Sequence, residues 1–368
     1  MTVAAPEGTR GELQRWLADQ LAADVAISSF ERPPGGRSND TFLFAVSWTE
    51  AATRIDARWV LRLQPMTTPI FRTPDVVREG RVLQGLEASS AVPVPHVRWI
   101  VADPHVLGAP FFVMDEVPGR VPLARPSIHA AGWLPTLSRT ELDTLWRSAL
   151  ETVVAVHAVD WRSSHAFLIE ASASTDAASH VDRIADWYEW TTAGREYPIT
   201  DAALEDIQRR TRSGAGAGSP AALVWGDARV GNMIFGPDHK VVAAIDWETA
   251  TIGPPEIDVA HWLFFDDFAT IACGVEPLPG WPDRSEVVST YESLAGRTLR
   301  DLDLFETLEA LFIATTLIRQ SDARVARGLS PETTRMGHDN AVTQMLARRL
   351  GLPVPELSPD YLAHRGAS

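Results

Sequence analysis

The chain has 368 residues, 45% hydrophobic and 22% charged, a composition typical of a folded globular protein larger than one average domain. A formal net charge of −15 disfavours nucleic acid as a partner, because phosphate backbones bind to basic surfaces. The single cysteine, Cys273, excludes an intrachain disulfide and a zinc site built from cysteines. Residues 1–10 do not have the pattern of a signal peptide, and no apolar run reaches membrane-spanning length, so we expect a cytoplasmic protein without a membrane partner.

The first 117 residues predict a mostly antiparallel sheet with one inserted helix, preceded by an amphipathic helix at 11–22. Alternating apolar residues and aromatic or β-branched content predict strands at 24–31, 41–48, 58–64, 92–102 and 109–117. The inserted helix is expected at 75–88, where apolar residues recur with helical spacing. We therefore expect an N-terminal lobe over residues 1–117, to which the motifs described below give a nucleotide-binding role.

After Gly119 the pattern becomes mainly helical, which predicts a larger C-terminal lobe over residues 118–368. Helices are expected at 139–158, 178–193, 201–212, 257–270, 285–295, 301–326 and 332–350. The glycine-rich stretch 213–220 is expected to be a loop, and residues 353–368 a loose tail.

Two stretches in this lobe place polar residues directly after apolar, strand-like runs. LVWGDARVGNMIF (223–235) contains Asp227, Arg229 and Asn232, and KVVAAIDWETATIG (240–253) contains Asp246. The first three residues have the Asp-x-Arg-x-x-Asn spacing of a kinase catalytic loop. In phosphoryl transfer, Asp227 would accept the proton of the acceptor hydroxyl and Arg229 would neutralise charge on the transferred group. Asn232 and Asp246 would bind Mg²⁺ through oxygen atoms, which hard cations prefer.

Three features of the N-terminal lobe match the order in which a kinase presents its nucleotide-binding groups. A glycine-rich turn lies between two strands, a basic residue in the third strand can pair with phosphates and with a helix glutamate, and the fifth strand offers backbone groups to adenine. Taken alone, each feature has an equally good structural explanation. The glycine-rich turn could be a plain hairpin turn, the basic residue could lie on a half-exposed strand, and the fifth strand could be an edge strand. The predicted cofactor-binding residues are Gly35, Gly36, Ser38, Asn39, Arg62, Glu79, Met114, Asp115, Glu116 and Val117.

At these motifs the chain resembles the aminoglycoside phosphotransferase family, the small-molecule branch of the kinase-like fold. WGDARVGN (225–232), IDWE (245–248) and GPPEIDVAHW (253–262) carry the resemblance. The front half, with GGRSNDTFLF and LGAPFFVMDEVPGR, is similar to a subgroup of bacterial phosphotransferases and to the kinase-like domain joined to acyl-CoA dehydrogenases. The resemblance covers about residues 25–320.

The resemblance implies an α+β, bilobal protein-kinase-like fold, with an N-terminal antiparallel sheet lobe and a larger, mainly helical C-terminal lobe. It implies Mg²⁺-dependent transfer of the γ-phosphate of ATP or GTP to a hydroxyl of a small molecule, and it gives Asp258 the role of bracing the catalytic loops. Two residues depart from the family pattern: Trp225 replaces a histidine and Arg62 replaces a lysine. Neither departure removes the base or the Mg²⁺ ligands, so transfer is expected, but both leave open the alternative of a pseudokinase that binds a nucleotide without transferring phosphate. Transfer of a nucleotidyl group instead of a phosphoryl group is a further alternative.

The acceptor is expected to bind the C-terminal helices, which include an acidic stretch. Asp266, Asp267 and Glu276 could attract an amine-bearing acceptor such as an aminoglycoside or aminosugar, although a solvated helical surface would look the same. The aromatic residues of this region would equally suit an apolar, hydroxyacyl-like acceptor, or simply pack in the core: Trp262, Phe264, Phe265, Phe268 and Trp281. The sequence leaves the acceptor and the oligomeric state open.

Overall fold

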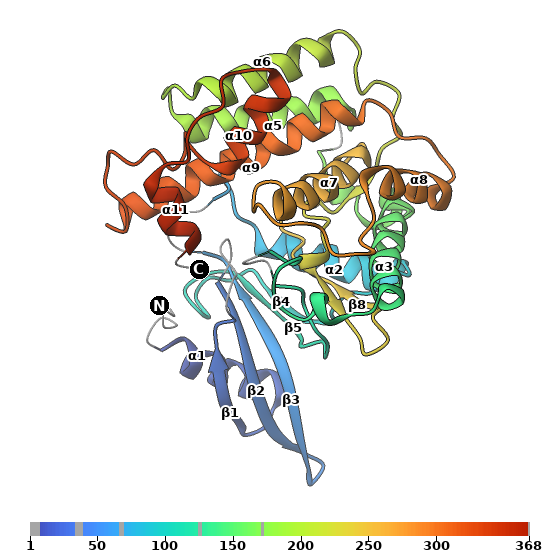
Figure 1. The fold of residues 1–368 in the computed structure, drawn as a ribbon. Coiled ribbons are helices and arrows are strands. Elements are labelled where there is room, and N and C mark those ends of the chain that lie inside the picture. The colour runs from blue at the N-terminus through green and yellow to red at the C-terminus, as the bar shows by residue number, and fades with distance from the viewer. Residues whose placement is uncertain (1–7, 34–39, 66–69, 124–126, 171–172, 367–368) are drawn as a thin grey trace. The chain divides into compact units, whose positions relative to one another are not determined.

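The structure is a computed structural model that describes residues 8–33, 40–65, 70–123, 127–170 and 173–366 (Figure 1). The chain divides into two compact units. Unit 1 comprises Met1–Pro69 and Thr73–Pro118, and unit 2 comprises Ile70–Arg72 and Gly119–Ser368. The glycine-rich turn with Gly35, Gly36, Ser38 and Asn39 lies outside the described residues.

Unit 1 is built on a five-stranded antiparallel sheet with the strand order β1-β2-β3-β5-β4. Its elements are α1 (Thr9–Leu21), β1 (Val25–Glu31), β2 (Asp40–Glu50), β3 (Thr53–Leu63), α2 (Val76–Ser89), β4 (Val97–Val101) and β5 (Phe111–Asp115). Alternate residues of β2, including Phe42 and Phe44, are buried against Trp59 and Leu61 of β3, so one face of the sheet forms the core. Leu17 of α1 packs against the same core.

Unit 2 is mainly helical. Its longer helices are α3 (Arg139–His157), α5 (Ala177–Thr192), α6 (Pro198–Arg212), α7 (Glu256–Thr270), α8 (Arg284–Ala295), α9 (Leu302–Ala326), α10 (Ala341–Leu350) and α11 (Pro359–Gly366). Short helical turns occur at α4 (Trp161–Ser164), η1 (Leu134–Thr136), η2 (Ala166–Leu168) and η3 (Val230–Asn232). Helix α9 packs against α5, α6, α7 and α10, and is therefore the central element of this unit (Figure 1).

Two small antiparallel pairs of strands lie in unit 2. β6 (Ala222–Val224) pairs with β9 (Thr251–Gly253), and β7 (Met233–Phe235) pairs with β8 (Val241–Ala244). The two segments that connect one pair of strands to the other therefore carry the sequence motifs: residues 225–232 join β6 to β7, and residues 245–250 join β8 to β9. This pairing brings together the ends of strands that are separated in the sequence.

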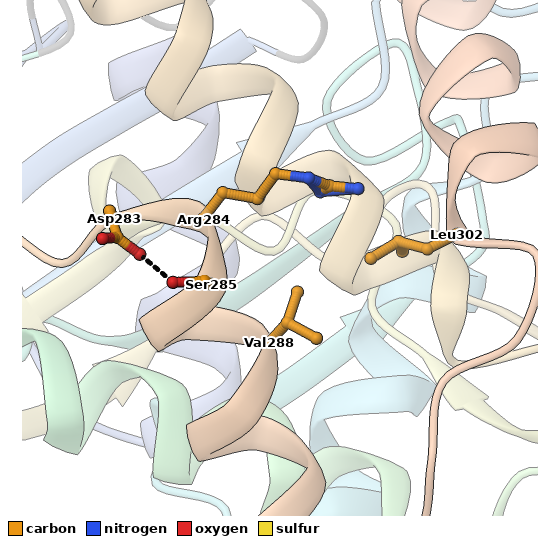
Figure 2. A pocket seen from close by; sticks show the side chains of 5 residues that line it. All are labelled: Asp283, Arg284, Ser285, Val288 and Leu302. Carbon is orange, nitrogen blue, oxygen red and sulfur yellow. Dashed lines mark hydrogen bonds between the residues drawn. The ribbon is translucent and has the colours of Figure 1, made fainter.

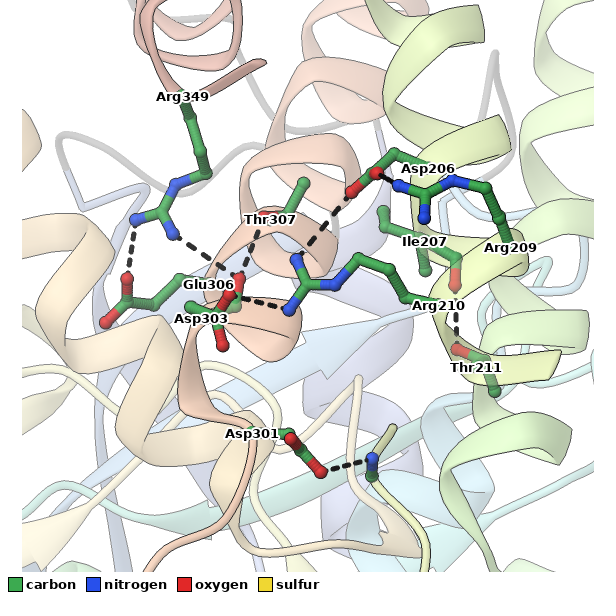
Figure 3. A network of polar contacts seen from close by, with 11 residues as sticks. Asp206, Ile207, Arg209, Arg210, Thr211, Asp301, Asp303, Glu306, Thr307 and Arg349 are labelled. Atoms are coloured by element: carbon green, nitrogen blue, oxygen red, sulfur yellow. Dashed lines mark hydrogen bonds and ion pairs between the residues drawn. The ribbon is translucent and has the colours of Figure 1, made fainter. Parts of the chain in front are cut away.

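A network of polar contacts joins α6, α9, α10 and the glycine-rich loop after α6 (Figure 3). Arg210 of α6 donates to Asp303 at the start of α9 over 2.6 Å, and Arg349 of α10 donates to Glu306 over 2.5 Å. Asp301 accepts the backbone N–H of Gly216 over 2.7 Å. These contacts fix the N-terminal end of α9. The same helix carries Glu309, a buried residue of the candidate site described below.

The structure corrects several expected element boundaries. The helix expected at 332–350 begins only at Ala341, because Asn340 caps it by accepting the backbone N–H groups of Val342 and Thr343. Residues 353–368 are not simply a loose tail, since α11 lies within them and its Tyr361 is 3% exposed in the core. The strand expected at 92–102 is confined to 97–101, because the two prolines of VPVP lack the N–H groups that a sheet requires.

The described part of the chain contains no helix with the length and apolar content needed to cross a membrane.

Candidate active site

The backbone of the loop 225–232 is held by one buried carboxylate. Asp258 of α7 is 0% exposed, and it accepts the backbone N–H of Trp225 and that of Gly226, both over 2.7 Å. Gly226 has a φ of +84°, a conformation that residues with a side chain rarely adopt. A Cβ atom on Gly226 would also lie 2.6 Å from Oγ1 of Thr249 in the neighbouring loop. The turn therefore requires glycine on two independent grounds.

Asp258 has a further hydrogen-bonding partner, which in turn is held from the other side. Nε2 of His157 lies 2.9 Å from Oδ2 of Asp258, and Nδ1 of the same ring lies 2.7 Å from the hydroxyl of Tyr291. Arg297 donates to that hydroxyl over 2.8 Å. Three donors thus surround a carboxylate that has no exposed surface, which offsets the desolvation of its charge.

Asp227 presents its two carboxylate oxygens to different surroundings. Oδ1 lies 2.8 Å from Nε of Arg229 and 2.7 Å from Nε2 of His261. Oδ2 accepts no hydrogen bond from any residue that the structure describes, and the side chain is 24% exposed. Burial acts to raise the pKa of Asp227, but Arg229 and His261 outweigh it and hold that pKa below its usual value. Asp227 therefore offers one ionised, accessible oxygen.

His261 lies between two carboxylates. Its Nδ1 is 2.9 Å from Oε2 of Glu309, which projects from α9, and its side chain is 1% exposed. Burial acts to lower the pKa of His261, but the hydrogen bonds to Asp227 and Glu309 prevail and raise it to about 9. Burial raises the pKa of Glu309. Neither His261 nor Glu309 is among the residues expected from the sequence, although the Asp-x-x-His spacing places Asp258 and His261 on one face of a helix.

Arg229 is fixed from two sides. Its Nε donates to Asp227, and its guanidinium lies 4.8 Å from the ring centroid of Phe265 on α7. The side chain is 22% exposed, so its remaining N–H groups can reach a ligand. Arg229 can therefore supply positive charge next to the open oxygen of Asp227.

The hairpin of β7 and β8 brings Asn232 and Asp246 to the same end of two paired strands. Met233 is paired with Ala244, and the N–H of Ile245 donates to the carbonyl of Asn232 over 3.0 Å. Nδ2 of Asn232 donates to the carbonyl of Asp227 over 3.0 Å, and Oδ1 accepts no hydrogen bond from the described residues. One amide oxygen and one carboxylate suit Mg²⁺, which commonly completes its coordination with water and substrate phosphates. The described residues contain no group of three or more His, Cys, Asp or Glu that could hold a metal by itself.

Trp225 links the two loops at the position where the resemblance implies histidine. Its indole N–H donates to the backbone carbonyl of Asp246 over 3.1 Å, and its ring stacks on Trp247 with centroids 5.0 Å apart. Asp246 has a φ of +67°, so its backbone is in the left-handed region. Trp225 is 0% exposed, which shows that this departure from the family pattern is accommodated within the core of the site.

In unit 1, the predicted pair of Arg62 and Glu79 is present. Nη2 of Arg62 lies 2.8 Å from Oε1 of Glu79, and the two side chains are 10% and 2% exposed. Nη1 of Arg62 also donates to Thr41 on β2 over 2.9 Å. The arginine head group therefore lies at a defined position on the central strand β3.

The segment expected to bind adenine offers fewer backbone groups than the sequence implied. Met114 is buried in β5, and the N–H groups of Asp115 and Glu116 donate to the carbonyls of His96 and Arg58. The N–H of Val117 donates to none of the described residues. The carboxylates of Asp115 and Glu116 pair with Arg98 and Arg58.

The three acidic residues predicted for the acceptor have different surroundings. Asp267 and Glu276 are exposed, whereas Asp266 is partly buried near Trp262 and Trp281. Burial raises the pKa of Asp266 to about 7. Asp266 would therefore carry only part of a negative charge at neutral pH unless a cation bound beside it.

A pocket of about 440 Å³ lies where α8 and α9 begin (Figure 2). Its lining residues are Asp283, Arg284, Ser285, Val288 and Leu302. Ser285 donates to Asp283 over 2.6 Å, and Arg284 pairs with Glu306. None of these lining residues is among the predicted catalytic or acceptor-binding residues.

The model of the phosphotransferase enzyme family (APH) matches residues 29–297, which is most of the chain. The chain belongs to this family. The predicted family and the kinase-like α+β fold are therefore confirmed, and the predicted phosphotransferase class is that of the family.

Relatives of this phosphotransferase-family chain include much longer proteins. Acyl-CoA dehydrogenase family member 10 of Mus musculus is 28% identical over 264 residues, which are 71% of this chain and 22% of the relative. Acyl-CoA dehydrogenase family member 11 of Homo sapiens is 26% identical over 234 residues, which are 62% of this chain and 27% of the relative. The chain thus matches about a quarter of the length of these relatives.

Solved structures share the fold. A "putative aminoglycoside phosphotransferase" from Ralstonia eutropha is 22% identical, with a TM-score of 0.67, covering 93% of this chain and 98% of that one. Aminoglycoside phosphotransferase APH(4)-Ia, solved with ADP and hygromycin B, is 18% identical, with a TM-score of 0.57, covering 92% of this chain and 98% of that one. The agreement extends over the full length of each solved chain rather than over one motif.

We predict that Gly226→Ala destabilises unit 2 by about 2–5 kcal/mol, because the new Cβ both opposes the positive φ and contacts Thr249. Chemical unfolding followed by circular dichroism measures the change. Gly274→Ala is the matched control: its φ is +65°, but none of the non-adjacent residues that the structure describes has an atom within 4 Å of the added Cβ, so a loss of about 1–2 kcal/mol is expected. Equal losses in the two variants would contradict the role given to Thr249.

We predict that Glu79→Ala destabilises unit 1 by about 3–5 kcal/mol, because the charge of Arg62 is left buried without its carboxylate. Urea unfolding measures the loss. Asp56→Ala is the control, since it removes an ion pair with Arg54 whose side chains are 71% and 66% exposed, and its unfolding midpoint should stay that of the wild type. A Glu79→Ala midpoint equal to that of the control would show that the buried pair does not stabilise unit 1.

Proposed function

We propose that the protein transfers the γ-phosphate of Mg·ATP or Mg·GTP to a hydroxyl of a small molecule. The observation that carries the proposal is the environment of Asp227, which has one oxygen held by two cationic groups and the other open. A carboxylate in this position can orient an acceptor hydroxyl and accept its proton, which is the role that phosphoryl transfer requires of the protein. Family membership supports the same reaction.

Asn232 and Asp246 are proposed as the Mg²⁺ ligands. Bound there, the ion would neutralise charge on the nucleotide phosphates. The free Oδ1 of Asn232 and the hairpin that carries Asp246 to the same end support the assignment. Arg229 is proposed to bind the transferred phosphoryl group, since its guanidinium is held in place and partly exposed.

In unit 1, we propose that Arg62, oriented by Glu79, binds nucleotide phosphates, and that the backbone of residues 114–117 binds the base. The glycine-rich turn containing Gly35, Gly36, Ser38 and Asn39 is proposed to cover the phosphates, as the family resemblance implies. The cytoplasmic location expected from the sequence remains part of this proposal.

Two acceptor classes have specific support. An amine-bearing acceptor, such as an aminoglycoside or aminosugar, is supported by Asp266, Asp267 and Glu276 and by a neighbour of the same fold solved with hygromycin B. An apolar hydroxyacyl acceptor is supported by Phe265 and Phe268 of α7, which are only partly buried, and by relatives named as acyl-CoA dehydrogenases. Phosphorus NMR with Mg·ATP and Mg·GTP, run against separate pools of aminoglycosides, aminosugars and hydroxyacyl compounds, distinguishes the classes through a new phosphomonoester signal.

We predict that Asp227→Asn lowers kcat by about 10²- to 10⁴-fold while leaving Mg·nucleotide binding close to that of the wild type. Arg229 and His261 both donate toward Oδ1, so the amide oxygen should occupy that position and the NH₂ group should replace Oδ2. An NH₂ group there cannot accept a proton from the acceptor. Initial rates and calorimetric nucleotide titrations test this, with the exposed Asp238→Asn as control. Wild-type turnover in Asp227→Asn would refute the assignment of the base.

We predict that Asp246→Ala weakens the binding of Mg·nucleotide, because one of the two protein ligands of the ion is lost. Calorimetry with and without Mg²⁺ measures this effect. The variant should gain less affinity for the nucleotide on addition of Mg²⁺ than the wild type gains. If Mg²⁺ raised the nucleotide affinity of Asp246→Ala as much as that of the wild type, the ion would not be bound by Asp246. Nucleotide binding without transfer to any acceptor pool, in the wild type, would favour the pseudokinase alternative.

A further inference from the structure

Behind Asp227 lies a row of three side chains that come from three different parts of the fold. Glu309 on α9 contacts Nδ1 of His261 on α7 over 2.9 Å, and Nε2 of His261 contacts Oδ1 of Asp227 over 2.7 Å. The side chains of His261 and Glu309 are 1% and 4% exposed. The ring is therefore shielded from water while both of its nitrogens face carboxylate oxygens.

This arrangement favours a charged ring while both carboxylates are ionised. A neutral imidazole carries one N–H, so one of its two nitrogens would point a lone pair at a carboxylate oxygen. An imidazolium donates from both nitrogens and satisfies both partners. The geometry thus matches a doubly protonated His261.

The charged groups of the described residues that surround the ring come from the loop 225–232, α7 and α9. Asp227 and Glu309 face its two nitrogens, and the ring of Phe265 lies beside it with centroids 4.8 Å apart. Arg229 lies on the far side of Asp227 Oδ1, and Asp258, one turn earlier on α7, is engaged by its own three donors. Arg229 and His261 therefore both donate to Oδ1 of Asp227, and the carboxylate of Glu309 balances the charge of the buried His261.

We propose, resting on the phosphotransferase function above, that His261 and Glu309 are positioning residues for the catalytic base. The imidazolium of His261, held by Glu309, fixes Oδ1 of Asp227 together with Arg229, so that Oδ2 alone meets the acceptor hydroxyl. In the transfer, the acceptor oxygen bonds to the γ-phosphorus, the bond from that phosphorus to the leaving nucleotide diphosphate breaks, and the hydroxyl proton passes to Oδ2. His261 keeps both protons throughout and contributes orientation and charge.

The test separates positioning from a merely structural role. His261→Gln retains an N–H donor but no charge, and Glu309→Gln retains size and an acceptor while removing the carboxylate that stabilises the imidazolium. Both variants should lose about 10- to 100-fold in kcat with nucleotide KM and affinity within about twofold of the wild type. His239→Gln, which alters a second histidine–glutamate contact on the same unit, should keep the wild-type kcat.

The pH profile supplies a second readout. With the His261 pKa near 9, wild-type kcat should fall on the alkaline side around pH 9 as the imidazolium loses its proton. The free energy of unfolding should also fall at alkaline pH. Because folding raises the pKa of His261, its protonation stabilises the fold fully below about pH 6.5, and this stabilisation is lost as the pH rises through about 9. Glu309→Gln should shift the alkaline limb to lower pH, and His261→Gln should abolish it.

Nitrogen-15 NMR of the His261 ring tests the charge without turnover, and crystal structures of both variants test the orientation of Asp227. Two nitrogen signals at imidazolium shifts at neutral pH, and a rotated or disordered Asp227 in the variants, are the expected results. A neutral ring, an unchanged Asp227 orientation, or wild-type kcat and alkaline limb in both variants would overturn the inference. Absence of transfer by the wild type would instead count against the proposed function, and the two structural measurements would still decide the inference.

Discussion

The candidate site depends on the hydrogen bonds that Asp258 accepts from two consecutive backbone N–H groups. A carboxylate buried in the protein is unfavourable without donors, and here the N–H groups of Trp225 and Gly226 supply two of the three. Consecutive N–H groups can converge on one carboxylate only where the backbone turns sharply, which the positive φ of Gly226 provides. Asp227 follows directly, so the direction of its side chain is set by this turn.

The same helix serves three successive parts of the loop. Asp258, His261 and Phe265 lie at positions i, i+3 and i+7 of α7, on one face of the helix. They contact, in order, the backbone at 225–226, the carboxylate of Asp227 and the guanidinium of Arg229. Helix α9 then supports α7 through Glu309, and α9 is itself held by packing against the other long helices of unit 2. Precise placement of the loop is thus supplied by rigid helices rather than by the loop itself.

Much of this arrangement could be predicted from the sequence, and the exceptions have physical causes. Asp227, Arg229 and Asn232 lie within six residues, so local spacing is enough to group them. The strand that follows Asn232 and the strand that precedes Asp246 were recognisable, and antiparallel pairing then brings the two residues to one end. The periodicity of apolar residues also gave most helices and strands to within a few residues.

The parts that could not be predicted rest on contacts between distant segments. His261 and Glu309 are 48 residues apart, and nothing local indicates that a buried histidine will meet a buried glutamate. The acidic residues of 261–310 look alike in sequence, yet burial separates Asp266 from its exposed neighbours Asp267 and Glu276. The apolar pattern from residue 332 predicts too long a helix because Asn340 caps α10, and α11 is not predictable locally because its anchor, Tyr361, packs against a distant core.

Trp225 has a consequence for how the site responds to acidity. A histidine that joined the two loops would gain or lose a proton near neutral pH, and the strength of its hydrogen bond between the loops would change with pH. The indole N–H that joins them here neither gains nor loses a proton under conditions in which proteins fold. The hydrogen bond from Trp225 that joins the two loops is therefore insensitive to pH, and the response of the base to acidity depends instead on His261 and Glu309, which α7 and α9 bring to it.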